Sequence, residues 1–146
     1  IKLLDGLDLS KIVLPVDAVV ASEPARIAEA RTVLVTAIGP EDMMLDIGPA
    51  TIEAFVSIIK NASMVIWNGP LGLDEVPTFG HGTFAVAQAV ANVKDSVIGG
   101  GDTIASVTKL HLLEKYGYAS TGGGAMLEFL DGTQLPALKA LGYYSK

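Results

Sequence analysis

Two glycine triads carry the clearest chemical signal in this sequence. The triad 99–101 stands in VIGGGDT and the triad 122–124 in STGGGAM, and each follows an apolar run and precedes a helix-like segment. Glycine lets a ligand approach the backbone closely, and the free N–H groups of a helix N-terminus attract anions. A single triad could equally serve only as a tight strand-to-helix turn. Two triads in equivalent places favour phosphate binding.

Neither triad matches a familiar nucleotide fingerprint. No Gly-Lys-Ser or Gly-Lys-Thr follows, as a Walker loop requires, and Ile104 and Leu127 replace the third glycine of the dinucleotide pattern. Any phosphate held here would be bound by backbone dipoles, because the turns contain no positive side chain.

Asp102 directly follows the first triad, and two roles are open for it. Its carboxylate could hold a magnesium ion that bridges nucleotide phosphates, with Thr103 offering a hydroxyl and an N–H to the same group. It could instead cap the N-terminus of the following helix. Because an unshielded carboxylate repels phosphate, a phosphate site at this position requires a metal ion.

A third strand end, at Trp67, leads into the loop NGPLGLDEV. Asn68 offers an amide there, and Glu75 offers a carboxylate suited to ribose hydroxyls, although a solvated loop acid is the alternative for Glu75. Trp67 is better explained by strand packing than by base stacking. His81 and His111 stand far from the glycine turns, so we expect both at the surface.

Alternating strands and helices must position these residues. Apolar runs predict buried strands over residues 11–14, 18–21, 31–36, 63–67, 96–99 and 118–120. Helical spacing predicts helices over residues 51–59 and 82–93, and a third helix that Asp102 or Thr103 could cap. The stretches 37–48 and 69–80 are predicted to be irregular loops.

The continuous apolar runs are typical of a parallel sheet covered on both faces. The sequence therefore predicts an α/β fold: a three-layer, parallel-sheet, Rossmann-like domain with right-handed crossovers. In such a sheet the three glycine-rich turns all lie at the carboxyl edge, where ligands bind.

Composition limits the classes of function. The 146 residues are half hydrophobic, contain no cysteine and carry a formal net charge of −6, which fits one compact domain or part of one. The negative charge disfavours nucleic acid and acidic membrane surfaces as partners. No apolar run reaches the length of a membrane span, and no signal-peptide pattern is present. We expect a soluble, cytoplasmic protein without a disulfide or cysteine zinc site.

Several linked motifs resemble the C-terminal, nucleotide-binding half of phosphoglycerate kinase. In order they are LPVDAVVA, MLDIGP, VIWNGPLG, GTFAVAQA, IGGGDT, STGGGAMLEFL and LPAL. The resemblance spans essentially the whole chain but less than half of the family's usual length. It implies that residues 1–146 form a partial C-terminal nucleotide-binding domain, incomplete at its N-terminal side. It also implies that the N-terminal phosphoglycerate-binding domain of the family is absent from this chain.

The resemblance also implies an activity. The family transfers phosphate reversibly between 1,3-bisphosphoglycerate and ADP, giving 3-phosphoglycerate and ATP in glycolysis, with Mg²⁺ at the nucleotide. The implied nucleotide-binding residues are Leu45, Asn68, Gly69, Pro70, Gly72, Leu73, Glu75, Gly99, Gly100, Gly101, Asp102 and Thr103. Asp102 is also the implied metal ligand. The implied catalytic turn, whose helix N-terminus faces the phosphoryl group in transit, consists of Gly122, Gly123 and Gly124.

Within the implied nucleotide set, the adenine pocket, the ribose and the phosphates have different ligands. Glu75 matches the ribose ligand and Asn68 a residue near the phosphates. The positions that match the lining of the adenine pocket are Leu45, Pro70, Gly72 and Leu73.

Three positions depart from the family pattern. Met44 replaces a glycine before the pocket leucine, Asp74 replaces a Phe before Glu75, and Pro77 replaces a commoner residue. A side chain at Met44 is placed to crowd the base.

Turnover by this chain alone is not expected. All ten Lys and Arg lie outside the glycine turns, and in the family the missing domain binds phosphoglycerate through a basic patch and a catalytic arginine. The parent protein is expected to be a monomer, whereas the piece is expected to have an unpaired sheet edge and bare apolar faces, which favour self-association. The alternatives are a noncatalytic nucleotide-binding or interaction module of the same fold, and a generic α/β domain whose glycines only make turns.

Overall fold

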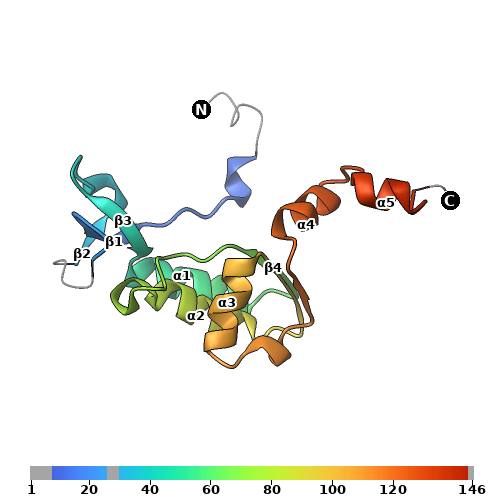
Figure 1. The fold of residues 1–146 in the computed structure, drawn as a ribbon. Helices are drawn as coiled ribbons and strands as arrows, with labels where there is room; N and C mark the ends of the chain where they lie inside the picture. The colour runs from blue at the N-terminus through green and yellow to red at the C-terminus, as the bar shows by residue number, and fades with distance from the viewer. Residues whose placement is uncertain (1–7, 26–29, 145–146) are drawn as a thin grey trace.

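The computed structural model describes residues 8–25 and 30–144 and contains two small sheets joined by helices (Figure 1). The strands are β1 (Asp17–Ala21), β2 (Arg31–Leu34), β3 (Met43–Ile47), β4 (Met64–Asn68), β5 (Asp95–Gly99) and β6 (Tyr118–Ser120). The helices are α1 (Pro49–Lys60), α2 (His81–Val90), α3 (Gly101–Lys109), α4 (Gly123–Leu130) and α5 (Pro136–Ala140). Short 3₁₀ turns cover Leu9–Lys11, Val35–Ala37, Pro77–Phe79 and Leu113–Lys115.

The first sheet has the order β2-β1-β3, and β1 runs antiparallel to both neighbours. The prediction that residues 18–21 and 31–36 belong to a parallel sheet is therefore wrong. The prediction of an irregular loop over residues 37–48 is also wrong, since β3 lies inside it. The apolar run of β3 is short and contains Asp46, so its local pattern did not separate it from the surrounding acids, Gly and Pro.

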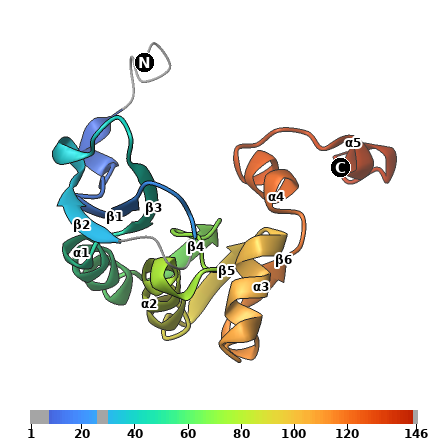
Figure 2. The same cartoon turned by 60° about the vertical axis from the view of Figure 1, so that its left-hand side comes forward.

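The second sheet has the order β4-β5-β6 and is parallel throughout (Figure 2). Asn68 pairs with Gly99, and Gly99 pairs with Ser120, so all three strands end at one edge. The predicted α/β class with a parallel sheet is confirmed, and so is the expectation that the glycine-rich turns share the carboxyl edge.

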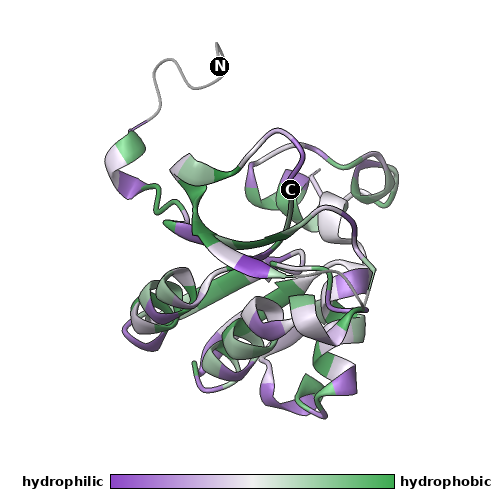
Figure 3. Cartoon of the chain, turned by 90° about the vertical axis from the view of Figure 1, so that its left-hand side faces the viewer, coloured by the Kyte–Doolittle hydropathy of each residue, from purple (hydrophilic) through white to green (hydrophobic). Residues whose placement is uncertain are grey.

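Helices α1, α2 and α3 lie on one side of the strands (Figure 3). The core between them and the second sheet contains Trp67, Val86, Ala87, Val90, Ile98, Val107 and Tyr116. α2 ends at Val90, earlier than predicted, because the chain turns there. On the other face of β4, Met64 and Ile66 are 55% and 44% exposed. The expectation of a bare apolar sheet face agrees with this exposure.

The predicted strand over residues 11–14 is wrong. The chain forms a 3₁₀ turn at Leu9–Lys11 and then continues without pairing to any described strand. Val13 and Leu14 are exposed, and Pro15 has no N–H to donate to a sheet. An apolar run was not sufficient to form a strand here, because no neighbouring strand satisfies its backbone.

The first sheet is fastened to α1 by a buried carboxylate. Asp17 accepts hydrogen bonds from the N–H groups of Ala50 at 3.0 Å and Thr51 at 2.8 Å, and from the Thr51 hydroxyl at 2.6 Å. Burial opposes ionisation of Asp17, but these hydrogen bonds outweigh it and hold the pKa below its usual value. Asp17 thus serves as the missing side-chain cap of α1.

Candidate functional site

The ends of β4, β5 and β6 bring the two glycine triads into contact. A Cβ added at Gly123 would collide with the amide of Asn68 and lie 2.8 Å from the backbone N and Cα of Gly100. A Cβ at Gly99 would meet the Asn68 Oδ1 at 2.9 Å and clash with Met126. Glycine is therefore required at Gly123 by the close approach of the Gly100 backbone, whereas Gly99 is crowded by the side chains of Asn68 and Met126.

Each triad opens a helix toward this edge. Gly100 is the N-cap of α3 and Gly122 the N-cap of α4, and neither cap has a side chain to occupy the first N–H groups. Gly100 has a φ of 92°, a conformation that glycine adopts readily. A Cβ at Gly101 or Gly124 would meet nothing within 4 Å, so the space beside the first turn of each helix is open at these residues. Two uncapped helix N-termini at one edge are suited to anions.

Asp102 is not the N-cap of α3, so that alternative is wrong. It lies in the first turn of α3 with an exposed side chain, and no described residue forms a hydrogen bond or ion pair with its carboxylate. Among residues 8–25 and 30–144, no group of three or more His, Cys, Asp or Glu could form a metal cage. Mg²⁺ commonly binds through one carboxylate together with nucleotide phosphates and water, and this donor set fits that arrangement.

Thr103 is fully buried, and its hydroxyl has a structural partner. The Thr103 Oγ1 accepts a hydrogen bond from the Gly69 N–H at 2.8 Å. The hydroxyl expected near phosphate therefore fixes the start of the loop after β4 against the start of α3. Trp67 is 7% exposed and donates from Nε1 to the Gly69 carbonyl at 2.7 Å, which confirms its packing role.

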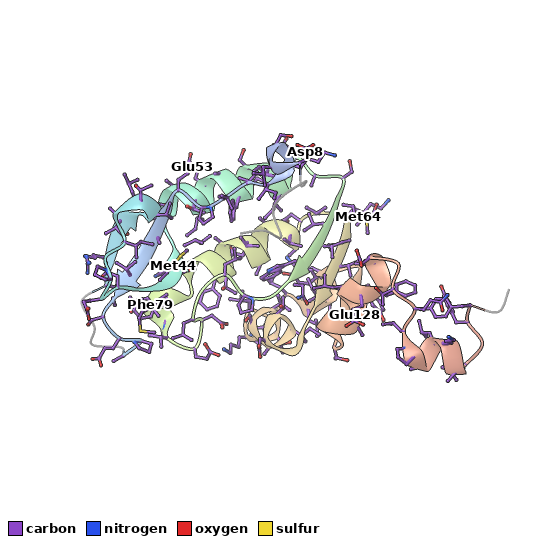
Figure 4. The ribbon with its side chains drawn as sticks, turned by 90° about the horizontal axis from the view of Figure 1, so that it is seen from above. Asp8, Met44, Glu53, Met64, Phe79 and Glu128 are labelled. Carbon is purple, nitrogen blue, oxygen red and sulfur yellow. The ribbon has the colours of Figure 1, made fainter. Side chains whose placement is uncertain are left out.

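The residues implied for an adenine pocket come together around one apolar hollow. A pocket of about 470 Å³ is lined by Pro24, Met43, Met44, Leu45, Pro70, Leu71, Gly72 and Leu73. Met44, labelled in Figure 4, lines it from β3 with a side chain that is 46% exposed. The part of the chain that the structure describes contributes no charged side chain to this lining, which suits a flat heterocycle better than a phosphate.

Hydrogen bonds hold the loop that forms one wall of this pocket. The Leu73 N–H donates to the Leu45 carbonyl at 2.9 Å. The N–H groups of Leu71 and Gly72 donate to the Thr83 Oγ1 at 3.0 and 3.2 Å. The wall is therefore tied to β3 and to α2.

Asp46 is a buried acid beneath the pocket that sequence reasoning missed. Its carboxylate accepts hydrogen bonds from the N–H groups of Ile47 at 2.8 Å and Gly82 at 2.9 Å. Desolvation by burial outweighs these hydrogen bonds and raises the pKa of Asp46. Gly72 and Gly82 both lie so close to this carboxylate that a Cβ at either would clash. The available signal was an acid inside an apolar run, MMLDI.

The adjacent acids Asp74 and Glu75 have different surroundings. Glu75 is exposed, as expected for a ribose ligand or for a solvated loop acid. The Asp74 side chain is 5% exposed and contacts Ser106 and Lys109 on α3. Both predicted surface histidines, His81 and His111, are exposed.

A second apolar pocket, of about 330 Å³, lies between α1, α2 and β4. Its lining includes Phe55, Ile58, Ile66, Trp67 and Val90. It contains none of the glycine turns, and Ile66 belongs to the exposed face of β4. The convergence of helix ends and hydrogen-bonded loop therefore makes the pocket beside Met44 the better candidate for a ligand.

Comparison with known proteins gives a consistent result. The family model described as phosphoglycerate kinase matches residues 3–133. The structure of phosphoglycerate kinase from Coxiella burnetii is similar with a TM-score of 0.80 and 42% identity, over 87% of this chain and 33% of that one. The phosphoglycerate kinase from Pyrococcus horikoshii OT3 is similar with a TM-score of 0.79 and 34% identity, over 96% of this chain and 34% of that one.

The chain thus spans about a third of the length of these solved structures. Within the described ranges, no helix is both long enough and apolar enough to cross a membrane.

Proposed function

The chain belongs to the phosphoglycerate kinase family, and we propose on that basis that it is the C-terminal, ATP/ADP-binding part of such a kinase. The proposed reaction is reversible phosphate transfer between 1,3-bisphosphoglycerate and ADP, giving 3-phosphoglycerate and ATP in glycolysis. One observation carries the proposal: two uncapped helix N-termini lie beside Asn68 and Gly69 at the end of β4, and the loop that continues from there lines an apolar pocket with residues 70–73.

The nucleotide would lie along this loop. The adenine would occupy the pocket lined by Leu45, Pro70, Gly72 and Leu73, and the exposed Glu75 would bind the ribose. The phosphates would lie near Asn68 and Gly69, against the backbone of Gly99, Gly100, Gly101 and Thr103. Backbone N–H groups would bind them without a positive side chain in the turn.

Asp102 would hold the magnesium ion that accompanies the nucleotide. Its exposed carboxylate at the start of α3 is free of described partners, which suits a shared protein–nucleotide metal site. The bound ion would neutralise phosphate charge. Without it, Asp102 would repel the phosphates from the same helix end.

The triad Gly122, Gly123 and Gly124 would face the phosphoryl group in transit. Preorganised backbone dipoles aimed at developing negative charge stabilise a transition state, and α4 presents such dipoles. The basic side chains and the phosphoglycerate site would come from other parts of a longer polypeptide. We therefore propose that the chain alone does not turn over and that the longer enzyme works as a cytoplasmic monomer.

A noncatalytic nucleotide-binding module is the second candidate. Two observations favour it. The described pocket lining contains no charged side chain, and neither glycine triad contains Lys or Arg. Such a module would bind Mg-ADP as well as the first candidate does. Only the longer polypeptide, assayed for ADP formation from phosphoglycerate and Mg-ATP, separates the two.

Titration of the 146-residue chain with Mg-ADP, followed by Trp67 fluorescence, tests the binding site. The Trp67 side chain donates a hydrogen bond to Gly69 at the start of the loop, so the fluorescence of Trp67 should change when Mg-ADP binds. Asp102→Ala should weaken Mg-ADP binding by about tenfold or more and remove its dependence on Mg²⁺. The matched control is Asp95→Ala, an exposed aspartate at the opposite end of β5. Equal affinities for the wild type and Asp102→Ala would contradict the proposal.

A further inference from the structure

The wall of the base pocket and the phosphate end of α3 are held by separate contacts. The loop at Leu71–Leu73 donates backbone hydrogen bonds to Thr83 of α2 and Leu45 of β3, as described above. α3 is joined to the same loop at its own first turn, where Thr103 accepts from Gly69. This contact by itself fixes only the first turn of α3 relative to the loop.

Asp74 supplies a second contact between the loop and α3. Its Oδ2 lies 2.7 Å from the Ser106 Oγ and 3.5 Å from the Lys109 Nζ. Ser106 is 1% exposed, and Lys109 is largely exposed at the C-terminal end of α3. Asp74 therefore contacts α3 at Ser106 and Lys109, about one and two helical turns beyond Asp102.

The hydrogen bond from Ser106 is directed mainly at Asp74. The Ser106 hydroxyl has one proton and two acceptors in reach, the Asp74 carboxylate at 2.7 Å and the Asp102 carbonyl at 2.9 Å. A carboxylate is the stronger acceptor and the nearer one here. Lys109 adds an ion pair that solvent screens on the lysine side. Ser106 is therefore the main partner.

We propose that Asp74, acting through Ser106 and Lys109, is a positioning residue that fixes the distance and angle between the base pocket and the phosphate-binding end of α3. The inference rests on the proposed nucleotide site. We call the contacts of Asp74 with Ser106 and Lys109 the clamp. Leu73 and Glu75 flank Asp74, so the clamp fixes the base and ribose side of the site relative to the helix that carries Asp102. A nucleoside diphosphate with magnesium spans both halves, whereas adenosine or pyrophosphate occupies only one. The clamp should therefore matter most for the ligand that spans the site.

The experiment compares three probes on the 146-residue chain: Mg-ADP, adenosine, and pyrophosphate with Mg²⁺. Asp74→Ala should weaken Mg-ADP binding by about tenfold, the usual worth of a hydrogen bond to a charged group. Adenosine and Mg-pyrophosphate should each change by less than about twofold, because each half keeps its own anchors. Calorimetry or chemical-shift titration measures all three.

Three further variants separate positioning from folding. Ser106→Ala should reproduce most of the loss, and the double variant with Asp74→Ala should bind Mg-ADP no more weakly than Asp74→Ala alone, because the two residues act as one unit. Asp74→Asn keeps the side-chain volume and carries the test if the alanine variant does not fold. Ser57→Ala, a serine on the exposed side of α1, is the matched control and should bind like the wild type.

Each outcome decides the matter. A folded Asp74→Ala that binds Mg-ADP as the wild type does would overturn the clamp alone. An equal loss of all three probes would assign Asp74 a merely structural role and would also overturn it. Failure of the wild type to bind Mg-ADP would overturn the proposed function, and the clamp with it.

Discussion

The two sheets of the molecule contribute to the proposed site in different ways. The antiparallel β2-β1-β3 sheet lines the base pocket with side chains, among them Met43, Met44 and Leu45. The parallel β4-β5-β6 sheet presents bare backbone at the ends of its strands, where Gly99 and Gly123 approach Asn68. The difference predicts which substitutions each half tolerates. A pocket wall made of side chains can accept substitutions that change its shape. A surface made of glycine backbone is blocked when a substitution adds a Cβ.

The two halves also use carboxylates differently. Asp17 and Asp46 of the first sheet are buried and hydrogen-bonded to the N–H groups of helices α1 and α2. Asp102 of the second half is exposed at the start of α3. The buried acids therefore have structural partners, while an exposed acid at an uncapped helix end is available to a ligand.

The largest effect should come from placing a methyl group inside the backbone surface. Gly123→Ala would put Cβ 2.8 Å from the Gly100 backbone and should lower the free energy of unfolding by about 3 kcal/mol. Gly124→Ala is the neighbouring control, since its Cβ would meet nothing within 4 Å. Urea unfolding measures both. Similar free energies of unfolding for the two variants would contradict the claim that the backbone at Gly123 is too crowded for a Cβ.

Thr83 tests the side-chain half. Its buried Oγ1 accepts hydrogen bonds from the N–H groups of Leu71 and Gly72, so Thr83→Ala should cost about 2 kcal/mol by leaving two partly buried donors unpaired. Thr83→Ser retains the hydroxyl and should cost less than half as much. If urea melts show the same loss for serine as for alanine, the methyl group and not the hydrogen bonds supports the pocket wall.

Asp17 and Asp46 should respond to pH in opposite directions. The pKa of folded Asp17 lies below its usual 3.8, so its stabilisation is present above pH 3.8 and is lost as pH falls through the folded value. The pKa of folded Asp46 lies above 3.8, so its contribution is present below pH 3.8 and is lost as pH rises through the folded value.

Denaturant unfolding of Asp17→Asn and Asp46→Asn from pH 3 to 7 checks this contrast. The advantage of the wild type over Asp17→Asn should shrink as pH falls. Relative to Asp46→Asn, the wild type should lose stability as pH rises. Parallel curves for the two variants would show that the buried acids of the first sheet do not differ in the way their hydrogen bonds and burial indicate.

The smallest effect concerns the shape of the base pocket. Met44 lines the pocket from β3, and Met44→Gly should strengthen Mg-ADP binding by about threefold by relieving crowding of the base. Met64→Gly makes the same change on the exposed face of β4, outside the pocket, and should leave Mg-ADP affinity unchanged. Weaker binding by Met44→Gly would mean that Met44 is a contact for the base and not an obstacle.

Local sequence signals were sufficient for the parallel sheet and for the helix starts at its two glycine triads. Each strand of the parallel sheet is a short apolar run, and the turn after it begins with Asn68-Gly69 or contains a glycine triad, so strand ends and helix starts were visible in the sequence. The first half depends on pairing between distant segments. Val19 pairs with Asp46, and neither residue indicates the other locally.

Buried acids account for most of what the sequence did not reveal. The sequence predicts irregular loops around both Asp46 and Asp74, because an acid normally indicates a solvent-exposed position. Their donors, Gly82 and Ser106, lie more than thirty residues away in the sequence, a separation that local reasoning does not reach. The residues of the candidate site were predicted mainly through linked motifs, and their functional roles stay predictions.

Chemical-shift mapping of the ¹⁵N-labelled chain with Mg-ADP tests the central claim most directly. The account predicts that the largest amide shifts fall on Gly100–Asp102 and Gly123–Gly124, with a second group at Leu73, and that Mg²⁺ alone does not reproduce them. Shifts confined to the pocket around Phe55 and Ile66, with none at the two triads, would contradict it.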